Sequence, residues 1–208
     1  MASCCNNQNF DGVSSTYKRV LLVVIALNAS MFVIEIRAGV MAGSQALQAD
    51  ALDFLGDTIT YSISLFVIGM PLVWRARTAL VKGLTLALSG TWILASTLYQ
   101  SLTFSLPRPE IMGVVALLAL AANLISVVLL VQFRNGDSNV RSVWLCSRND
   151  AIGNLAVLLA AGGVWSTNSA WPDLLVAGIM ASLFLWSAIQ ITKQAVREIH
   201  TAGDAVGA

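Results

Sequence analysis

Carboxylates at helical spacing interrupt an otherwise apolar stretch of this chain. Asp50, Asp53 and Asp57 stand at positions i, i+3 and i+7, which share one face of a helix. Three carboxylates on one face repel one another when they are ionised, so protons or a cation must neutralise them. A role in packing alone fits them poorly, and the spacing predicts a site for a cation or for protons.

A second pair of metal-binding residue types follows further along the chain. Cys146 and Asp150 are four residues apart, so they also lie on one face of a helix. If this pair faces Asp53 and Asp57, the four side chains supply three carboxylates and one thiolate. That set suits zinc or cadmium better than magnesium or calcium. We expect the metal ligands to be Asp53, Asp57, Cys146 and Asp150, with a small buried hydrophobe as the alternative for Cys146.

Accessory contributions to this site are expected from four further residues: Asp50, Asn149, Cys4 and Cys5. For Asp50, structural or gating roles are open beside ligation. For the Cys4–Cys5 pair the alternative is an unstructured tail. Arg148 lies about 200° round the helix from Cys146 and from Asp150, so we expect it to point away from them.

Other polar residues in the apolar segments have two interpretations. Asn28, Asn123 and Asn154 fit hydrogen bonds that join helices, although other roles stay open for them. Glu35 either pairs with Arg37 or caps a polar cluster.

Composition indicates the environment of these residues. Of 208 residues, 57% are hydrophobic and 11% are charged, whereas a soluble domain has about 25% charged residues. A membrane-spanning helix needs about 20 mostly apolar residues. We therefore predict an all-α membrane protein with six transmembrane helices, at 20–41, 45–73, 83–102, 111–133, 142–165 and 172–192. The net charge of +1 gives no reason to expect nucleic acid as a partner.

Breaks between the predicted spans come from turn residues. Residues 42–44 leave room only for a tight hairpin, Pro107 and Pro109 separate the third and fourth helices, and residues 134–137 separate the fourth and fifth. We predict an N-terminal cytosolic tail at 1–17, a transport domain at 18–195 and a short cytosolic tail at 196–208.

Basic residues predict the orientation in the bilayer. One side of the six-span arrangement holds most of them, namely Lys18, Arg19, Arg75, Arg77, Lys82, Arg134, Arg141, Lys193 and Arg197. Only Arg37 and Arg108 fall on the other side. Because positive residues favour the cytoplasmic side, we expect both termini to lie in the cytoplasm. We expect the protein to be a multi-pass protein of the inner membrane.

The depth of the two predicted pairs is a constraint on the helix ends. At 1.5 Å per residue, Asp150 lies about 13 Å from Arg141, whereas Asp57 lies about 25 Å from Trp74. The two levels agree only if the fifth helix starts closer to Asp137, or if the second helix extends into the cytosol past Pro71.

Several of these residues form a recognisable pattern. The spacing of Asn28, Phe32, Glu35 and Gly39, followed by GSQALQADALDFLGD at 43–57, resembles the first two helices of the cation diffusion facilitator family. The stretch 150–157 is similar to the family's fifth-helix motif, and 171–173 to the start of its sixth helix. The resemblance implies a homodimeric exporter of zinc or related divalent ions driven by inward proton flow. By position, its transport site falls on Asp53, Asp57, Cys146 and Asp150.

Two departures from the family pattern affect this interpretation. Cys146 stands where the family usually has a histidine, and Asp53 stands where zinc-specific members often have a second histidine. These two differences favour a softer transported ion such as cadmium. The family's cytosolic domain after the sixth helix and the histidine-rich loop of some members are expected to be missing. A homodimer would then be held by the membrane helices.

We therefore predict proton-coupled efflux of a divalent metal by alternating access, with no bound cofactor and no enzymatic activity. The partners are the metal ion, protons and the lipid bilayer. One alternative is a small-molecule proton antiporter, which leaves the paired spacing and Cys146 unexplained. Another is a magnesium-dependent membrane prenyltransferase, because Asp50, Asp53 and Asp57 also fit its DxxDxxxD pattern. An intramembrane aspartyl protease needs a GxGD signature, which residues 54–57 lack.

Overall fold

The computed structural model describes residues 14–66, 72–103, 106–135 and 138–207. Within these ranges the chain forms six α-helices and one short 3-10 helix, with no strand. The α-helices are α1 (Ser15–Ala42), α2 (Gln45–Phe66), α3 (Leu72–Thr103), α4 (Pro109–Leu130), α5 (Ser138–Thr167) and α6 (Trp171–Gly207), and the 3-10 helix is η1 (Val131–Phe133). The predicted all-α fold with six long helices is confirmed.

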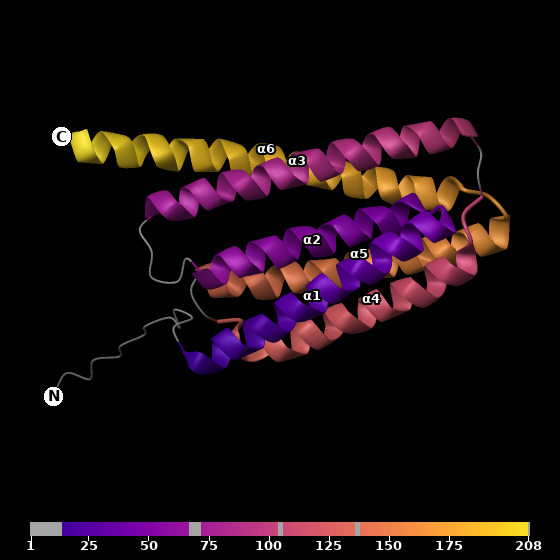
Figure 1. Ribbon diagram of the computed structural model, residues 1–208, viewed down its shortest axis with the longest axis horizontal. Coiled ribbons are helices and arrows are strands. Elements are labelled where there is room, and N and C mark those ends of the chain that lie inside the picture. The colour runs from indigo at the N-terminus through magenta and orange to yellow at the C-terminus, as the bar shows by residue number, and fades with distance from the viewer. Residues whose placement is uncertain (1–13, 67–71, 104–105, 136–137, 208) are drawn as a thin grey trace.

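The six helices divide into a group of four and a pair. α1, α2, α4 and α5 pack together, while α3 and α6 lie side by side and contact each other more than either contacts any single helix of the group (Figure 1). Close packing of α3 and α6 depends on Gly90, where an added Cβ would lie 2.9 Å from Leu185 Cγ and 3.1 Å from the Ala181 carbonyl oxygen. The pair is joined to the group through one buried apolar core to which all six helices contribute.

The face of α1 that is buried in the group of four includes polar residues. Buried residues recur on this helix at alternating spacings of three and four, namely Tyr17, Leu21, Val24, Asn28, Met31, Glu35, Ala38 and Ala42. Asn28 and Glu35 are on this face, and they are 1% and 0% exposed. Large apolar side chains such as Leu22 and Val40 point outward, as expected for helices in contact with lipid.

Gly43 ends α1 and allows the hairpin predicted at 42–44. It has a φ of 67°, in the left-handed region that favours glycine. The Gly43 N–H donates to the Val40 carbonyl, and the Ser44 N–H donates to the Gly39 carbonyl at 3.0 Å. This is a Schellman cap. Two residues therefore suffice to reverse the chain into α2.

Asp173 of α6 caps the start of α2. Its carboxylate accepts hydrogen bonds from Ser44 Oγ at 2.6 Å, from the Gln45 N–H at 2.8 Å and from the Ala46 N–H at 3.1 Å. Gln100 of α3 donates to the Gly43 carbonyl and accepts from Gln45 Nε2, both at 2.6 Å. Both members of the α3–α6 pair are thus attached to the first residues of α2.

The predicted helix boundaries are partly wrong. The sequence predicts that the second helix reaches residue 73 and that the third begins at residue 83, but α2 ends at Phe66 and α3 begins at Leu72. Pro71 stands immediately before α3, where a proline removes no helical hydrogen bond. The continuous apolar run around it concealed the break. α6 extends to Gly207 and so includes most of the predicted tail at 196–208.

Asp57 and Asp150 lie at similar depths along their helices, and only one of the two expected features of the helix ends accounts for it. α5 begins at Ser138, so Asp150 lies about 18 Å along its helix, while Asp57 lies about 14 Å from the end of α2 at Phe66. The early start of α5 is confirmed, and an extension of α2 past Pro71 is not.

Four segments of the described residues are long and apolar enough to cross a membrane: Ser15–Ala42, Leu80–Thr103, Pro109–Phe133 and Trp171–Arg197. α2 and α5 are long enough but less apolar, because they carry the acidic residues. The chain is therefore a helical membrane protein, and the two described α-helices outside this set of spans, α2 and α5, lie within the group of four.

Candidate metal site

Carboxylates from α2 and α5 meet inside the group of four. The Asp150 side chain of α5 is within hydrogen-bonding reach of both Asp53 and Asp57 of α2. These residues surround a small closed cavity, without room for a water molecule, that is lined by Asn28, Asp50, Asp53, Phe54, Asp57, Asn123 and Asp150. Three of the four predicted ligands therefore converge on one internal space.

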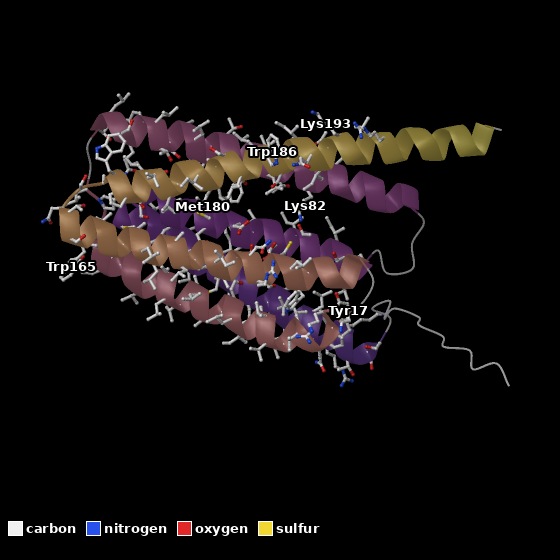
Figure 2. All side chains as sticks on the ribbon, turned by 180° about the vertical axis from the view of Figure 1, so that it is seen from behind. Tyr17, Lys82, Trp165, Met180, Trp186 and Lys193 are labelled. Carbon is white, nitrogen blue, oxygen red and sulfur yellow. The ribbon has the colours of Figure 1, made fainter. Side chains whose placement is uncertain are left out.

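The four carboxylates that line the cavity differ in how deeply they are buried. Asp50 and Asp57 are buried, with 2% and 8% of their surfaces exposed, whereas Asp53 and Asp150 are half-buried. Lys82 of α3 interacts electrostatically with Asp53 and Asp57 from the side of the α3–α6 pair, and Figure 2 shows it on the part of α3 next to the group of four. This lysine partly offsets the negative charge of the carboxylates.

Cys146 lies next to the cavity but does not line it. Its side chain is half-buried and packs at the edge of an apolar cluster made by Tyr17, Leu21, Val24, Tyr61, Leu130 and Val143. The Tyr61 hydroxyl is 3.2 Å from Ser147 Oγ and joins α2 to α5 at this level. Asp57 is close enough to Cys146 to interact with it electrostatically. The thiol is thus one helical turn from Asp150, on the side of the cavity nearer the chain termini.

The predicted accessory residues have different positions. Asp50 lines the cavity, and Glu35 interacts with Asp50 rather than with Arg37, which is exposed. Glu35 therefore belongs to a polar cluster, one of its two expected roles. Asn149 is exposed and accepts a hydrogen bond from Arg148, so the structure does not bring it to the cavity.

Arg148 points away from the carboxylates, as predicted. It is exposed, and its guanidinium lies 5.4 Å from the centre of the Trp144 ring. Cys4 and Cys5 lie outside the described residues.

Sequence reasoning missed two polar residues that line the cavity. Asn28 of α1 and Asn123 of α4 line it, whereas the sequence left open whether they join helices or have another role. Asn123 does bond to another helix, because its Nδ2 donates to Asn154 Oδ1 at 2.8 Å. Their spacing on the buried faces of α1 and α4 was visible in the sequence, but the convergence of those faces on the α2 carboxylates was not.

The side chains are arranged for contact with one another rather than around a common point. No group of three or more His, Cys, Asp or Glu residues in the described part of the chain has its donor atoms placed to enclose a metal ion. A hydrogen bond between two carboxyl groups requires a proton on one of them. Chemically, this arrangement can hold protons between Asp150 and its two neighbours on α2.

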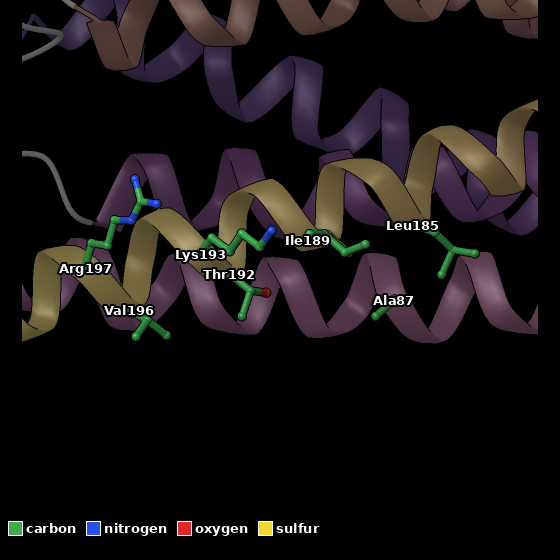
Figure 3. Close-up of a pocket in the computed structure, with 8 residues that line it drawn as sticks. Ala87, Leu185, Ile189, Thr192, Lys193, Val196 and Arg197 are labelled. Atoms are coloured by element: carbon green, nitrogen blue, oxygen red, sulfur yellow. The ribbon is translucent and has the colours of Figure 1, made fainter.

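A separate groove lies outside the group of four. It has a volume of about 570 Å³ between α3 and α6, with Leu185 and Ile189 on its walls and Lys193 and Arg197 at one end (Figure 3). Within the described ranges no carboxylate lines this groove, so it is not a candidate for metal binding.

A polytopic membrane protein with carboxylates of separate helices gathered inside it is of the class that handles ions or protons within the bilayer. The chain belongs to the cation efflux family, known also as the cation diffusion facilitators. The family's cation efflux transmembrane domain matches residues 76–200, which include Cys146 and Asp150. The resemblance seen in the sequence is confirmed.

Several relatives extend the likeness to α1 and α2. The chain is 26% identical to a cadmium, cobalt and zinc/H(+)-K(+) antiporter of Bacillus velezensis, over 92% of the chain and 65% of that relative. It is 29% identical to the metal cation efflux system protein CzcD of Cupriavidus metallidurans, over 81% of the chain and 56% of the relative. It is 25% identical to the zinc transporter ZitB of Pectobacterium atrosepticum, over 92% and 64%. The chain thus spans between half and two thirds of the length of these relatives.

Proposed function

We propose that this protein exports a divalent metal ion across a membrane in exchange for protons, with Asp53, Asp57 and Asp150 as the carboxylate ligands. The observation that carries this proposal is the convergence of these three side chains, from two helices, on one internal cavity. The names of the relatives, which include cadmium, cobalt and zinc antiport, support the choice of substrate.

Contact between the carboxyl groups supports the exchange of metal for protons. In the proton-loaded site, Asp150 shares protons with Asp53 and Asp57, which lie within its hydrogen-bonding reach. A divalent ion must replace those protons, because carboxylates bind metal in the ionised form. The side chains then separate around the ion. Release of metal on the far side of the membrane follows when protons return to the same oxygens.

Cys146 is proposed as the fourth ligand. It lies one helical turn from Asp150 and near Asp57, so a change of its side-chain rotamer directs the sulfur toward the carboxylates. A thiolate favours soft ions, and we propose cadmium and zinc as the physiological substrates.

The remaining features of the proposed transporter follow the family. We propose a homodimer held by membrane helices, placed in the inner membrane with both termini in the cytoplasm. Membership in the cation efflux family favours ion transport over the prenyltransferase and the small-molecule antiporter. It also favours a transporter over an enzyme.

Transport by purified protein in liposomes tests the proposal. With a pH gradient imposed across the vesicle membrane, we expect uptake of Cd²⁺ and Zn²⁺ by the wild type and none by Asp57→Asn. Glu110→Gln is the matched control, because Glu110 is an exposed acid at the start of α4, outside the cavity. Undiminished uptake by Asp57→Asn, or equal losses in the two variants, would overturn the assignment of the site.

A further inference from the structure

A chain of hydrogen bonds fixes the orientation of Asn123. Asn154 Nδ2 donates to Asp50 Oδ2 at 2.8 Å, and Asn154 Oδ1 accepts from Asn123 Nδ2 at 2.8 Å. The direction of this chain is set by Asp50, because the Oδ2 of its ionised carboxylate can only accept from an amide group. Asn154 must therefore present its nitrogen to Asp50 and its oxygen to Asn123. As a result, Asn123 directs its own amide oxygen away from Asn154.

Asn28 is oriented by its own helix. Its Nδ2 donates to the Val24 carbonyl at 2.8 Å, one turn earlier on α1. This bond leaves Oδ1 as the free end of the amide group. Two asparagines on different helices thus have their nitrogens engaged and their oxygens available.

Both amide oxygens belong to side chains that line the carboxylate cavity. Asn28 and Asn123 are 1% and 2% exposed, and within the described residues neither Oδ1 receives a hydrogen bond. Asp150 Oδ2 has no partner within the same set. A buried acceptor without a donor costs free energy. The cavity is therefore lined by oxygen acceptors, and a cation is the species that would satisfy several of them together.

We propose that Asn28 Oδ1 and Asn123 Oδ1 are ligands of the transported cation, adding two amide oxygens to the carboxylates of Asp53, Asp57 and Asp150. This inference rests on the proposed function and deepens it. Asp50 acts as a positioning residue, since its bond to Asn154 turns the Asn123 oxygen toward the cavity.

The chemistry of this set defines the class of ion that it favours. Carboxylate and amide carbonyl oxygens suit harder ions such as Mn²⁺, whereas a thiolate suits softer ones. Co²⁺, which is named for two of the relatives, is harder than Cd²⁺. The two amides are on α1 and α4, whereas Cys146 lies on α5 toward the chain termini. The site thus offers oxygen ligands from two helices beyond the predicted ones. Co²⁺ is expected to bind through the asparagines, and loss of either asparagine should weaken Co²⁺ binding.

Binding of Co²⁺ to the full chain in detergent micelles, measured by isothermal titration calorimetry, tests the inference. Variants of Asn28 give the clearest test, because in the described part of the chain its amide nitrogen bonds only within its own helix and its replacement breaks no bond to another helix. We expect Asn28→Leu to weaken Co²⁺ binding about tenfold or more, the range seen when groups around a metal are removed. Asn28→Asp keeps an oxygen at the same reach and should bind Co²⁺ at least as tightly as the wild type.

The two Asn28 variants separate ligation from a structural role. A carboxylate cannot donate to the Val24 carbonyl, so a purely structural role predicts that Asn28→Asp fails in the same way as Asn28→Leu. Asn123→Leu should also weaken binding. Its control is Ser126→Ala on the same helix, where the hydroxyl bonds to the Ala122 carbonyl one turn earlier. Retained melting temperatures would show that the variants are folded.

The outcomes distinguish this inference from the proposed function. Loss of Co²⁺ binding in Asp57→Asn and in Asn28→Leu, with binding kept in Asn28→Asp, supports both. Loss in Asp57→Asn with wild-type affinity in Asn28→Leu overturns the inference alone, as does loss in both Asn28 variants. Wild-type affinity in Asp57→Asn overturns the proposed site itself.

Discussion

Replacing Asp173 by alanine removes the carboxylate that caps α2 and leaves two buried backbone N–H groups, those of Gln45 and Ala46, without their acceptor. A buried donor without a partner costs about 1–3 kcal/mol, so the two together cost about 2–6 kcal/mol. Ser44 Oγ loses its short bond as well. For a chain of this size, each kcal/mol lowers the melting temperature by about 2–4 °C. The variant should therefore melt at least about 4–8 °C below the wild type.

Thermal unfolding of the detergent-solubilised protein, followed by size-exclusion chromatography after heating, measures this loss. Glu110→Ala is the matched control, because Glu110 is also an acid in the first turn of a helix but its side chain is exposed. Asp173→Asn should lie between alanine and the wild type, since its amide oxygen replaces only one of the two accepting carboxylate oxygens. Equal melting of Asp173→Ala and the wild type would refute the argument that this carboxylate holds α6 to α2.

Three further predictions concern other parts of the molecule. Lower pH should weaken Cd²⁺ binding, because protons compete for the same carboxylates; calorimetry in buffers of different ionisation enthalpy would detect the released protons, and a pH-independent affinity would contradict the proposal. Gly90→Ala should lower the melting temperature, since its Cβ would meet Leu185 at 2.9 Å, whereas Gly113→Ala, with nothing within 4 Å, should not. Cys146→Ser should reduce the preference for Cd²⁺ over Zn²⁺ in competition binding, and an unchanged ratio would remove the thiolate from the site.

Much of the site was predictable because it depends on local spacing. Residues four apart on a helix point to the same side whatever the fold, so the sequence alone places Asp53 and Asp57 together. The placement of Asp150 opposite them followed from two helices that each carry acidic residues in an apolar setting. The pattern of Gly43 and Ser44 likewise predicted the hairpin.

The rest depended on tertiary contacts that spacing does not specify. Asn28 and Asn123 lie on buried faces, but their roles follow from which way each amide group is turned. That orientation is set by Val24, Asn154 and Asp50. The end of α2 was misplaced because hydropathy alone does not separate two apolar helices that adjoin each other. Predicting that Asn149 is exposed would have required knowing which face of α5 is turned toward the other helices, and the tertiary contacts of α5 determine this.

The order of the helices along the chain also has a consequence for how this protein enters the bilayer. α2 and α5, the two helices that do not qualify as apolar spans, each follow directly after an apolar segment, Ser15–Ala42 or Pro109–Phe133, with mean hydropathies of 2.1 and 2.8. A lone α2 would bring three aspartates into lipid, at about 2.5–3.5 kcal/mol each near the bilayer centre. α2 packs against α1, and α5 packs against α4. During synthesis, each acidic helix therefore emerges beside a partner that is already able to insert, and the two can enter the membrane together as a hairpin.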